Sequence, residues 1–179
     1  MQSNGAITSD SELNDMKKIA LTRGQFALVD DDDFDRLNQY KWYASFSRHY
    51  APDGNYAAAR MVTVGGRQRM ILMHREIVNA PNGVHVDHKN RNPLDNQKVN
   101  LRLATPQQNG ANRRMQKNNT SGYKGVYLRR RSGKFVAQIK QNGEHIYLGR
   151  FETAVRAAQA YDEKAKEIHG EFAVLNFPD

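Results

Sequence analysis

Residues 86–102 read VDHKNRNPLDNQKVNLR. This run is rich in Asp, Asn and His, and a short apolar run lies on each side of it. Loops with such composition usually carry function, because packing alone does not require so many polar side chains. An acid beside an imidazole, followed by several carboxamides, can hold a hard divalent cation and activate a water. The run therefore predicts a strand, a long polar functional loop and a second strand.

A helix is predicted to follow, with Thr105 as its N-cap and the next residue, a proline, in its first turn. Asp87 and His88 are adjacent, so on a strand their side chains point to opposite faces. They reach the same substrate only where the strand bends into the loop. A metal held by Asp87 needs a second oxygen ligand, and Asn109 and Asn112 on the helix are the two candidates.

The residues before the loop predict two β-hairpins, with turns at 22–25 and at Gly65-Gly66. The acidic run Asp30–Asp33 is interpreted as the N-cap and first turn of a short helix, where acids favour the positive helix end. Metal binding by this run is the alternative. His74 is expected to begin another short helix. Two roles are open for His74. It either supports the residues that contact substrate or contacts substrate itself.

Charge and composition indicate the class of partner. The chain has 179 residues, a net charge of +8 and no cysteine. Residues 1–112 carry 14 Lys/Arg against 12 Asp/Glu, whereas residues 113–179 carry 13 against 7. A basic C-terminal module suits an acidic polymer such as DNA. The lack of cysteine excludes disulfides and Cys-based zinc sites and fits a reducing, intracellular setting. No apolar run is long enough to span a membrane, and no secretory signal opens the chain.

The C-terminal part predicts a small sheet and a helix. Residues 113–120 are polar and basic and are interpreted as a linker. Asn142-Gly143 is a strong tight-turn signal. Alanines recur at helical spacing from Ala154, and Gly170 is expected to end that helix. Three short strands are expected before it, at residues 123–128, 135–141 and 144–148.

The central motif resembles a known family. Its spacing is similar to that of an HNH endonuclease, the ββα-metal fold, in the His-Asn-Asn variant. The resemblance covers residues 17–112, and the upstream part looks like the region that homing nucleases of this family place before the motif. The residues that carry the resemblance are Asp87-His88, Asn100-Leu101-Arg102 and Asn109.

The resemblance implies a role for each of these positions. His88 corresponds to the general base, Asp87 to a metal ligand and Asn100 to the residue that braces the loop. Asn109 corresponds to the residue that completes the metal site, with Asn112 as its rival. One divalent metal is implied, and oxygen ligands around a phosphate favour Mg²⁺. The remaining loop side chains are expected to stabilise turns rather than bind metal. These are Asn90, Asn92, Asp95 and Asn96.

The C-terminal part resembles the DNA-binding domain of plant APETALA2/ethylene-response-factor proteins. The resemblance rests on residues 123–126, 133–135, 147–151, 157–162 and 175–178. It implies a three-stranded antiparallel sheet, packed on one helix, that reads DNA with the sheet. Its contact positions fall on Lys124, Tyr127, Arg129, Gln138, Lys140 and Tyr147.

This chain departs from the plant pattern at several positions. Tyr127 replaces an arginine, Tyr147 replaces a tryptophan, and the first turn is one residue longer. The base specificity of the plant proteins therefore does not carry over to this chain, whereas binding to the DNA backbone should. Arg130 and Arg131 are assigned to phosphate contact only.

Together these observations predict an α+β protein. We expect a flexible tail at 1–15, a ββα-metal HNH nuclease domain with preceding β-hairpins at 16–112, a basic linker at 113–120, and a three-stranded sheet on one helix at 121–179.

The predicted function is a metal-dependent, homing-type endonuclease acting on double-stranded DNA inside a bacterial or phage-infected cell. We expect no membrane or protein partner and a monomer, because no dimer face is evident. The alternative is a non-enzymatic DNA-binding regulator whose HNH-like half is only a scaffold. RNA is a weaker candidate partner, because the basic sheet lacks a stacking array of aromatic residues.

Overall fold

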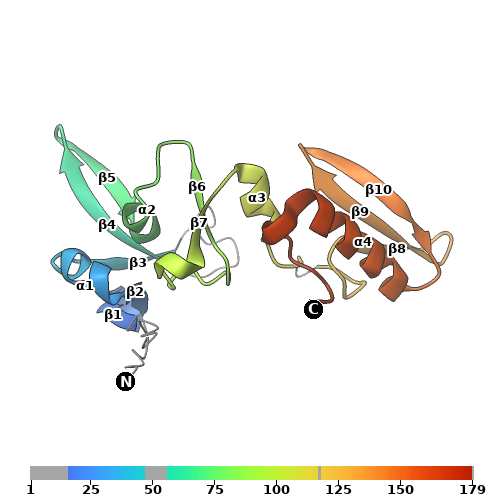
Figure 1. Ribbon diagram of the computed structural model, residues 1–179, viewed down its shortest axis with the longest axis horizontal. Coiled ribbons are helices and arrows are strands. Elements are labelled where there is room, and N and C mark those ends of the chain that lie inside the picture. Colours follow the sequence, from blue (N-terminus) through green and yellow to red (C-terminus); the bar gives the residue numbers. More distant parts are fainter. Residues whose placement is uncertain (1–15, 47–55, 117, 179) are drawn as a thin grey trace, which may run out of the picture.

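The computed structural model describes residues 16–46, 56–116 and 118–178. The tail predicted at 1–15 lies outside these residues. The half predicted to be a nuclease (residues 16–112, the nuclease half below) and the C-terminal module lie end to end along the long axis. Helix α3 (Pro106–Ala111), the last element of the first half, lies at the junction (Figure 1). Within the described residues, no helix is both long and apolar enough to cross a membrane.

The N-terminal segment is the first predicted hairpin followed by a short helix. Strands β1 (Met16–Ala20) and β2 (Phe26–Asp30) pair antiparallel around a 3₁₀ turn, η1 (Thr22–Gly24). Helix α1 (Asp31–Asn38) starts within the acidic run. Asp30 occupies its N-cap position and three acids fill its first turn, as predicted for Asp30–Asp33, although the Asp30 side chain makes no capping hydrogen bond.

The second predicted hairpin is also present, within a three-stranded antiparallel sheet of order β3-β4-β5. The hairpin turn lies at Gly65-Gly66, where both glycines have positive φ. The elements of this segment are β3 (Tyr43–Phe46), β4 (Tyr56–Val64), β5 (Arg67–Leu72) and α2 (Met73–Ile77).

The polar run Val86–Arg102 begins in one strand and ends in another. Strands β6 (His85–His88) and β7 (Leu101–Ala104) pair antiparallel. A 3₁₀ turn, η2 (Lys98–Asn100), closes the loop between them. Helix α3 follows, capped by a reciprocal pair of hydrogen bonds between Thr105 and Gln108, as the N-cap prediction required.

One hydrophobic core joins these segments. It contains residues from both hairpins, α1, α2 and the β6–β7 pair. The hairpins are therefore the packing surface on which the polar loop is built, not an independent unit. The core includes Ile19, Ala27, Val29, Leu37, Trp42, Ala58, Met73, Val86 and Leu101.

The C-terminal module has the predicted sheet and helix, with sheet order β10-β9-β8. Helix α4 (Ala154–His169) packs its alanine face on the sheet and ends before Gly170. The other elements are β8 (Val126–Arg129), β9 (Lys134–Gln141), β10 (Glu144–Phe151) and the 3₁₀ turn η3 (Gly170–Phe172).

The first strand of this module begins later than the predicted residue 123. Gly122 and Gly125 have φ values of 79° and 75°, which interrupt extended backbone before Val126. A Cβ on Gly125 would lie 2.0 Å from the Tyr161 ring and 2.8 Å from the Gln138 carbonyl oxygen. Gly125 therefore allows the backbone to pass directly against α4.

Substituting Gly125 tests this close approach. We expect Gly125→Ala to lower the free energy of unfolding by more than about 3 kcal/mol, since overpacking adds to the left-handed backbone penalty. Gly133→Ala is the matched control, because Gly133 has a φ of 66° and no atom within 4 Å of an added Cβ. It should cost only the backbone penalty of about 1–2 kcal/mol. Urea denaturation followed by circular dichroism measures both, and equal losses would contradict the packing argument.

Candidate nuclease site and DNA-binding face

Strand alternation in β6 divides the two central side chains between opposite faces. Val86 points into the core, and His88 shares its face. Asp87 and His85 point to the other face, toward α3, where each meets a helix side chain. The strand thus places a carboxylate on the helix side and an imidazole on the loop side.

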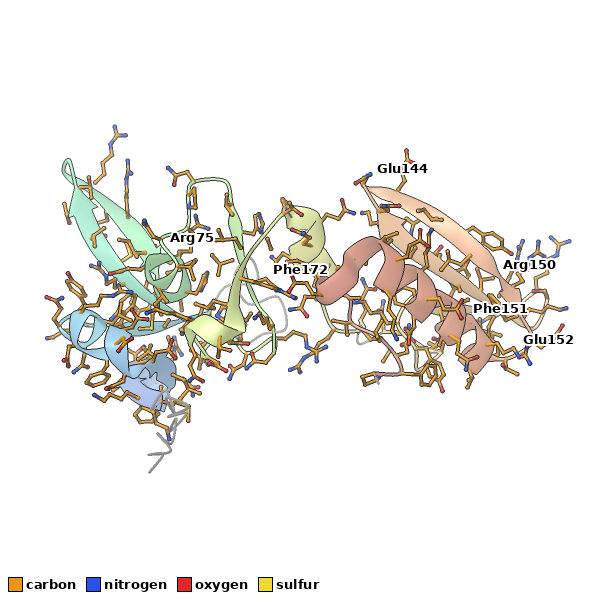
Figure 2. All side chains as sticks on the ribbon, in the orientation of Figure 1. Arg75, Glu144, Arg150, Phe151, Glu152 and Phe172 are labelled. Atoms are coloured by element: carbon orange, nitrogen blue, oxygen red, sulfur yellow. The ribbon has the colours of Figure 1, made fainter. Side chains whose placement is uncertain are left out.

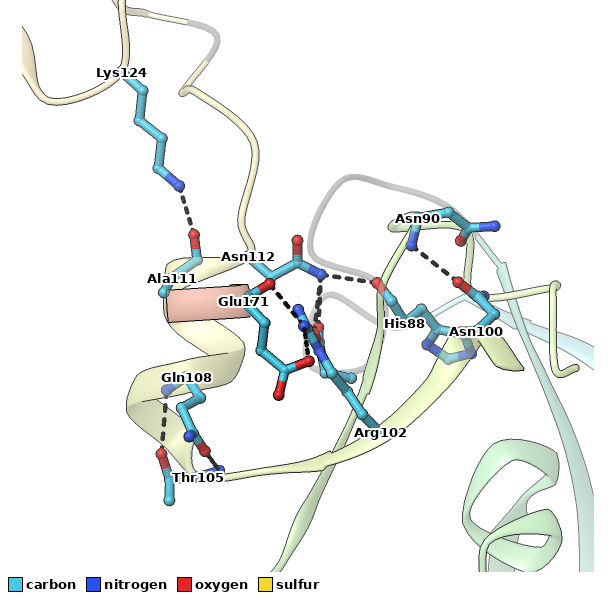
Figure 3. A network of polar contacts seen from close by, with 11 residues as sticks. His88, Asn90, Asn100, Arg102, Thr105, Gln108, Ala111, Asn112, Lys124 and Glu171 are labelled. Carbon is cyan, nitrogen blue, oxygen red and sulfur yellow. Dashed lines mark hydrogen bonds and ion pairs between the residues drawn. The ribbon is translucent and has the colours of Figure 1, made fainter. Parts of the chain in front are cut away.

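Asp87 is buried and has two polar partners. Arg102, its cross-strand neighbour on β7, places both Nε and Nη2 2.8 Å from Asp87 Oδ2. Asn112, at the C-cap of α3, donates from Nδ2 to Oδ1 at 2.9 Å and to Oδ2 at 3.0 Å. The same Nδ2 lies 2.8 Å from the backbone oxygen of His88 (Figure 3). Carboxylate, carboxamide and backbone carbonyl therefore meet at one point.

Asn109 lies one helical turn earlier and meets a different partner. Its Nδ2 is 3.3 Å from Nδ1 of His85, at the start of β6. Of the two helix candidates for the second metal ligand, the structure brings Asn112, and not Asn109, into hydrogen-bond contact with Asp87.

His88 is buried among polar neighbours. Its Nε2 lies 3.3 Å from Oδ1 of Asn96. With that carbonyl as acceptor, Nε2 carries the proton and Nδ1 keeps the lone pair. Burial lowers the pKa of His88, against the opposing effects of Asn96, Asp87 and Asp95. The neutral imidazole that a base requires is therefore the favoured form at neutral pH.

His74 on α2 packs against the ring of His88. The two ring centroids are 5.0 Å apart and the rings are edge to face, at 81°. Burial, then the charges of His88 and Arg75, lower the pKa of His74 to about 3. His74 is therefore a neutral, buried ring that supports His88, which agrees with the structural alternative for this residue.

Asn100 links the two ends of the loop. Its Oδ1 accepts from the backbone N–H of Asn90 at 3.0 Å, and its Nδ2 donates to the backbone oxygen of Asp95 at 2.7 Å. Within the loop, Asn90 also donates to the Asp95 carboxylate, and Asn92 Oδ1 accepts from the Leu94 N–H. These local bonds are the turn-stabilising pattern expected of short polar side chains.

The N-terminal hairpin holds the same loop through its backbone. Leu28 of β2 donates to the oxygen of Leu94 at 2.8 Å and accepts from the N–H of Asn96 at 2.8 Å. Asp30, at the end of β2, accepts from the N–H of Lys98 at 2.7 Å. The segment that presents Asn96 to His88 is therefore paired to a strand nearly 70 residues earlier.

Asp87 and Asn112 are the side chains that could hold a divalent metal with a small set of protein ligands. Among the described residues, no group of three or more His, Cys, Asp or Glu side chains is placed to hold a metal. One carboxylate and one carboxamide do meet, at Asp87 and Asn112. The oxygen and nitrogen of a carboxamide exchange places by a simple flip, which would turn the Asn112 oxygen inward. Mg²⁺ commonly takes one or two protein oxygens and keeps waters.

The outer face of the C-terminal sheet gathers most of the predicted DNA contacts. β9 turns Ala137 and Ile139 toward α4, so its alternate residues face away. Strand register pairs Tyr127 with Val136 and Tyr147 with Gln138, which places both tyrosines on that outer face. The face carries Tyr127, Arg129, Gln138, Lys140 and Tyr147, together with Lys134, His145 and Arg150.

Arg130 and Arg131 are exposed in the turn between β8 and β9, at one end of this face. They are accessible to a phosphate there. Lys134 forms an ion pair with Glu152, so its charge is partly neutralised.

Lys124 does not lie with the other predicted contacts. Its Nζ donates to the backbone oxygen of Ala111, the last residue of α3, at 2.6 Å. Burial, and then the charge of Arg91, lower the pKa of Lys124 to about 8, and Asp162 partly opposes this. In the structure Lys124 ties the C-terminal module to the nuclease half.

A second group of contacts also joins the two halves. Phe172 of η3 packs with Ala104 and Ala111 of the nuclease half. Beside it, Glu171 accepts a hydrogen bond from Arg102 through its backbone oxygen, at 2.8 Å. A cleft of about 540 Å³ between α3 and the C-terminal module is lined by residues including Arg113, Lys124, Lys140 and His169. The segment predicted as a linker thus joins two parts that are in contact.

Sequence reasoning gave no individual role in the site to Asn96 and Arg102. Asn96 was assigned to turn structure alone, although its carboxamide also reaches His88. Arg102 could have been found from the register, since a β6–β7 hairpin that pairs His88 with Leu101 pairs Asp87 with Arg102. No sequence signal placed Phe172 on the nuclease half.

Comparison with known proteins gives two family matches. A model described as HNH endonuclease matches residues 79–111, and the AP2 domain model matches residues 121–171. An uncharacterized HNH endonuclease of Acanthamoeba polyphaga mimivirus is 33% identical over 154 residues. That alignment covers 86% of this chain and 76% of the viral protein.

Plant proteins match the C-terminal module alone. Dehydration-responsive element-binding protein 2C of Arabidopsis thaliana is 45% identical over 64 residues, which are 35% of this chain and 18% of that protein. The AP2-like ethylene-responsive transcription factor TOE2 of the same plant is 42% identical over 65 residues, 36% of this chain and 13% of that protein. This chain belongs to the HNH endonuclease family and carries an AP2 DNA-binding domain after its HNH motif.

Proposed function

We propose that this protein is a homing-type DNA endonuclease that hydrolyses a phosphodiester with His88 as general base and one divalent metal at Asp87. The observation that carries the proposal is the geometry of β6. It presents a buried carboxylate to α3 and a neutral imidazole to the loop, within a chain of the HNH family.

His88 would take the proton of the attacking water at Nδ1. The Asn96 carboxamide oxygen, 3.3 Å from Nε2, would favour the tautomer with the proton on Nε2, which leaves the lone pair on the other nitrogen. Asn100 acts through the loop, because it fixes the turn that carries Asn96. His74 limits rotation of the His88 ring by packing on it.

Asp87 and one helix carboxamide would hold the metal. HNH nucleases typically use a divalent metal, and Mg²⁺ suits an oxygen-only site beside a phosphate. When bound, the ion would stabilise negative charge at the phosphate and the leaving oxygen. Resemblance assigned the helix position to Asn109, whereas contact with Asp87 favours Asn112, and we propose Asn112.

The AP2 sheet would deliver this site to double-stranded DNA inside the cell. Its outer face combines cations that can meet phosphates with Tyr, Gln and Arg side chains that can reach base edges. We propose a division into a nuclease domain at 16–112 and a DNA-binding domain at 121–179. A single HNH site in a monomer would make one nick.

The regulator alternative, in which the HNH half is a scaffold, accounts less well for the site. A scaffold would use Asp87 for its ion pair with Arg102, but it has no need of a neutral imidazole hydrogen-bonded to a carboxamide beside that carboxylate.

Replacing His88 tests the base. We expect His88→Ala to lower the cleavage rate of duplex DNA in Mg²⁺ by about 10²–10⁴-fold, the usual range for general-base catalysis. Affinity for the same duplex, measured in EDTA by fluorescence anisotropy, should stay within twofold, because the sheet is untouched. Equal cleavage by both proteins would remove His88 from the mechanism.

The helix ligand is tested by comparing two asparagines on the same helix. We expect Asn112→Ala to weaken Mn²⁺ binding by about 10–100-fold, with a matching loss of cleavage, because it removes the carboxamide from Asp87. Asn109→Ala is the matched control and should change metal affinity by less than twofold. Calorimetric Mn²⁺ titration measures both. The reverse ranking would assign the ligand to Asn109.

Charge removal on the sheet tests delivery to DNA. We expect the double variant Arg129→Gln/Arg150→Gln to make the slope of log affinity against log salt shallower by about 2, one unit for each phosphate that is no longer neutralised. The control Arg156→Gln/Lys164→Gln removes the same charge from α4 and should leave the slope unchanged. If both pairs change the slope equally, binding depends on net charge rather than on the sheet face.

A further inference from the structure

We propose that the AP2 module completes the nuclease site, by holding Arg102 in position against Asp87. Arg102 is then a positioning residue for the metal ligand, and Phe172 and Glu171 of the other module are part of its support. The inference rests on the proposed function, in which Asp87 binds the metal.

Arg102 contacts both halves of the protein at once. Toward the nuclease site, its Nε and Nη2 are each 2.8 Å from Asp87 Oδ2. Toward the AP2 module, its Nη1 is 2.8 Å from the backbone oxygen of Glu171 and 3.3 Å from the Glu171 carboxylate (Figure 3). The guanidinium carbon lies 3.7 Å from the centre of the Phe172 ring. With these partners the Arg102 side chain is 11% exposed.

The shape of the guanidinium makes this arrangement restrictive. Its donors lie in one rigid plane, so an arginine with one edge on Asp87 and another on Glu171 has little rotational freedom left. The Phe172 ring covers a face of the same plane, which adds a cation–π contact and excludes water from the ion pair. Glu171 contributes mainly through its backbone, because its side chain is 71% exposed.

Phe172 follows the last residue of the AP2 match directly, but it packs against the nuclease half. It is buried against Ala104 and Ala111, both from the nuclease half, and forms its cluster with them. Figure 2 labels Phe172 at the junction, near α3 and away from the far end of the sheet, where Arg150 lies. Removing this ring therefore disturbs the contact between the modules and not the core of either one.

Holding Arg102 also orients the carboxylate. With Oδ2 fixed by the guanidinium, Oδ1 of Asp87 is directed to Asn112, at 2.9 Å. Hydrogen-bonded partners behind a metal ligand fix its orientation, and losing them typically weakens metal affinity or activity by about 10–100-fold. The AP2 module therefore acts on catalysis through Arg102, in addition to binding DNA.

The test is a calorimetric titration of the full chain with Mn²⁺. We expect Phe172→Ala to weaken Mn²⁺ binding and slow cleavage by about 10-fold. Phe172→Leu, which keeps the apolar filling but loses the ring face, should fall between wild type and Phe172→Ala. Phe177→Leu is the control, because Phe177 contacts Tyr123 and not Arg102, and it should match wild type. Arg102→Lys keeps the charge without the planar fork and should weaken Mn²⁺ binding as much as Phe172→Ala does.

Two results would overturn the inference. Unchanged Mn²⁺ affinity in Phe172→Ala and Arg102→Lys would reduce the contact to simple packing between modules. Tighter Mn²⁺ binding in either variant would mean that Arg102 competes with the metal instead of orienting its ligand.

A second readout separates this inference from the proposed function. The Nε–H resonance of Arg102 in a ¹H–¹⁵N NMR spectrum should exchange slowly in wild type and broaden in Phe172→Ala, whether or not metal binds. DNA affinity in EDTA should be unchanged in Phe172→Ala, which shows that the AP2 sheet is intact. A wild type that neither binds Mn²⁺ nor cleaves DNA, but shows this NMR behaviour, contradicts the proposed function and leaves the docking of Arg102 supported. A wild type that binds and cleaves, with variants identical to it, contradicts the inference alone.

Discussion

The ion pair between Asp87 and Arg102 is the interaction on which the two halves of this protein depend. Both side chains are nearly buried, at 5% and 11% exposure. A buried carboxylate without a partner is strongly destabilising, and removing one member of such a pair commonly costs about 3–5 kcal/mol. β6 and β7 must therefore pair in the register that places these residues opposite each other. That register also fixes His88 at the end of the strand.

The imidazole depends on a longer chain of contacts. His88 is oriented by Asn96, and the backbone of Asn96 is bonded to Leu28 in the N-terminal hairpin. The Asp30 carboxylate accepts a hydrogen bond from the backbone N–H of Lys98, further along the same loop. The acidic run thus does two tasks. The run starts α1, and it also holds the polar loop in place. That loop has few apolar residues to pack, namely Pro93, Leu94 and Val99.

Local sequence signals predicted the elements well, because each depends on residues close together in the chain. The Gly65-Gly66 turn, the Thr105 cap and the Asn142-Gly143 turn carry their own geometry. Contacts between distant residues were not predictable in this way. The resemblance to the plant DNA-binding domain places Lys124 among the DNA contacts, yet its amine meets a helix end in the other half. Phe172 carries no sequence signal for a contact with the nuclease half, but it packs on Ala104 and Ala111.

Docking changes what the AP2 module contributes. A module on a flexible linker raises the local concentration of DNA near the site but leaves the distance between binding and cleavage free to vary. Here Lys124 and Phe172 both hold the module against Ala111 of α3, Lys124 by a hydrogen bond and Phe172 by packing. In the proposed function, a rigid arrangement would lower the orientational entropy cost of bringing a duplex bound on the sheet to β6. Arg102 lies within that contact. The surface that fixes the distance between the two modules therefore also orients the Asp87 carboxylate, at which the metal would bind.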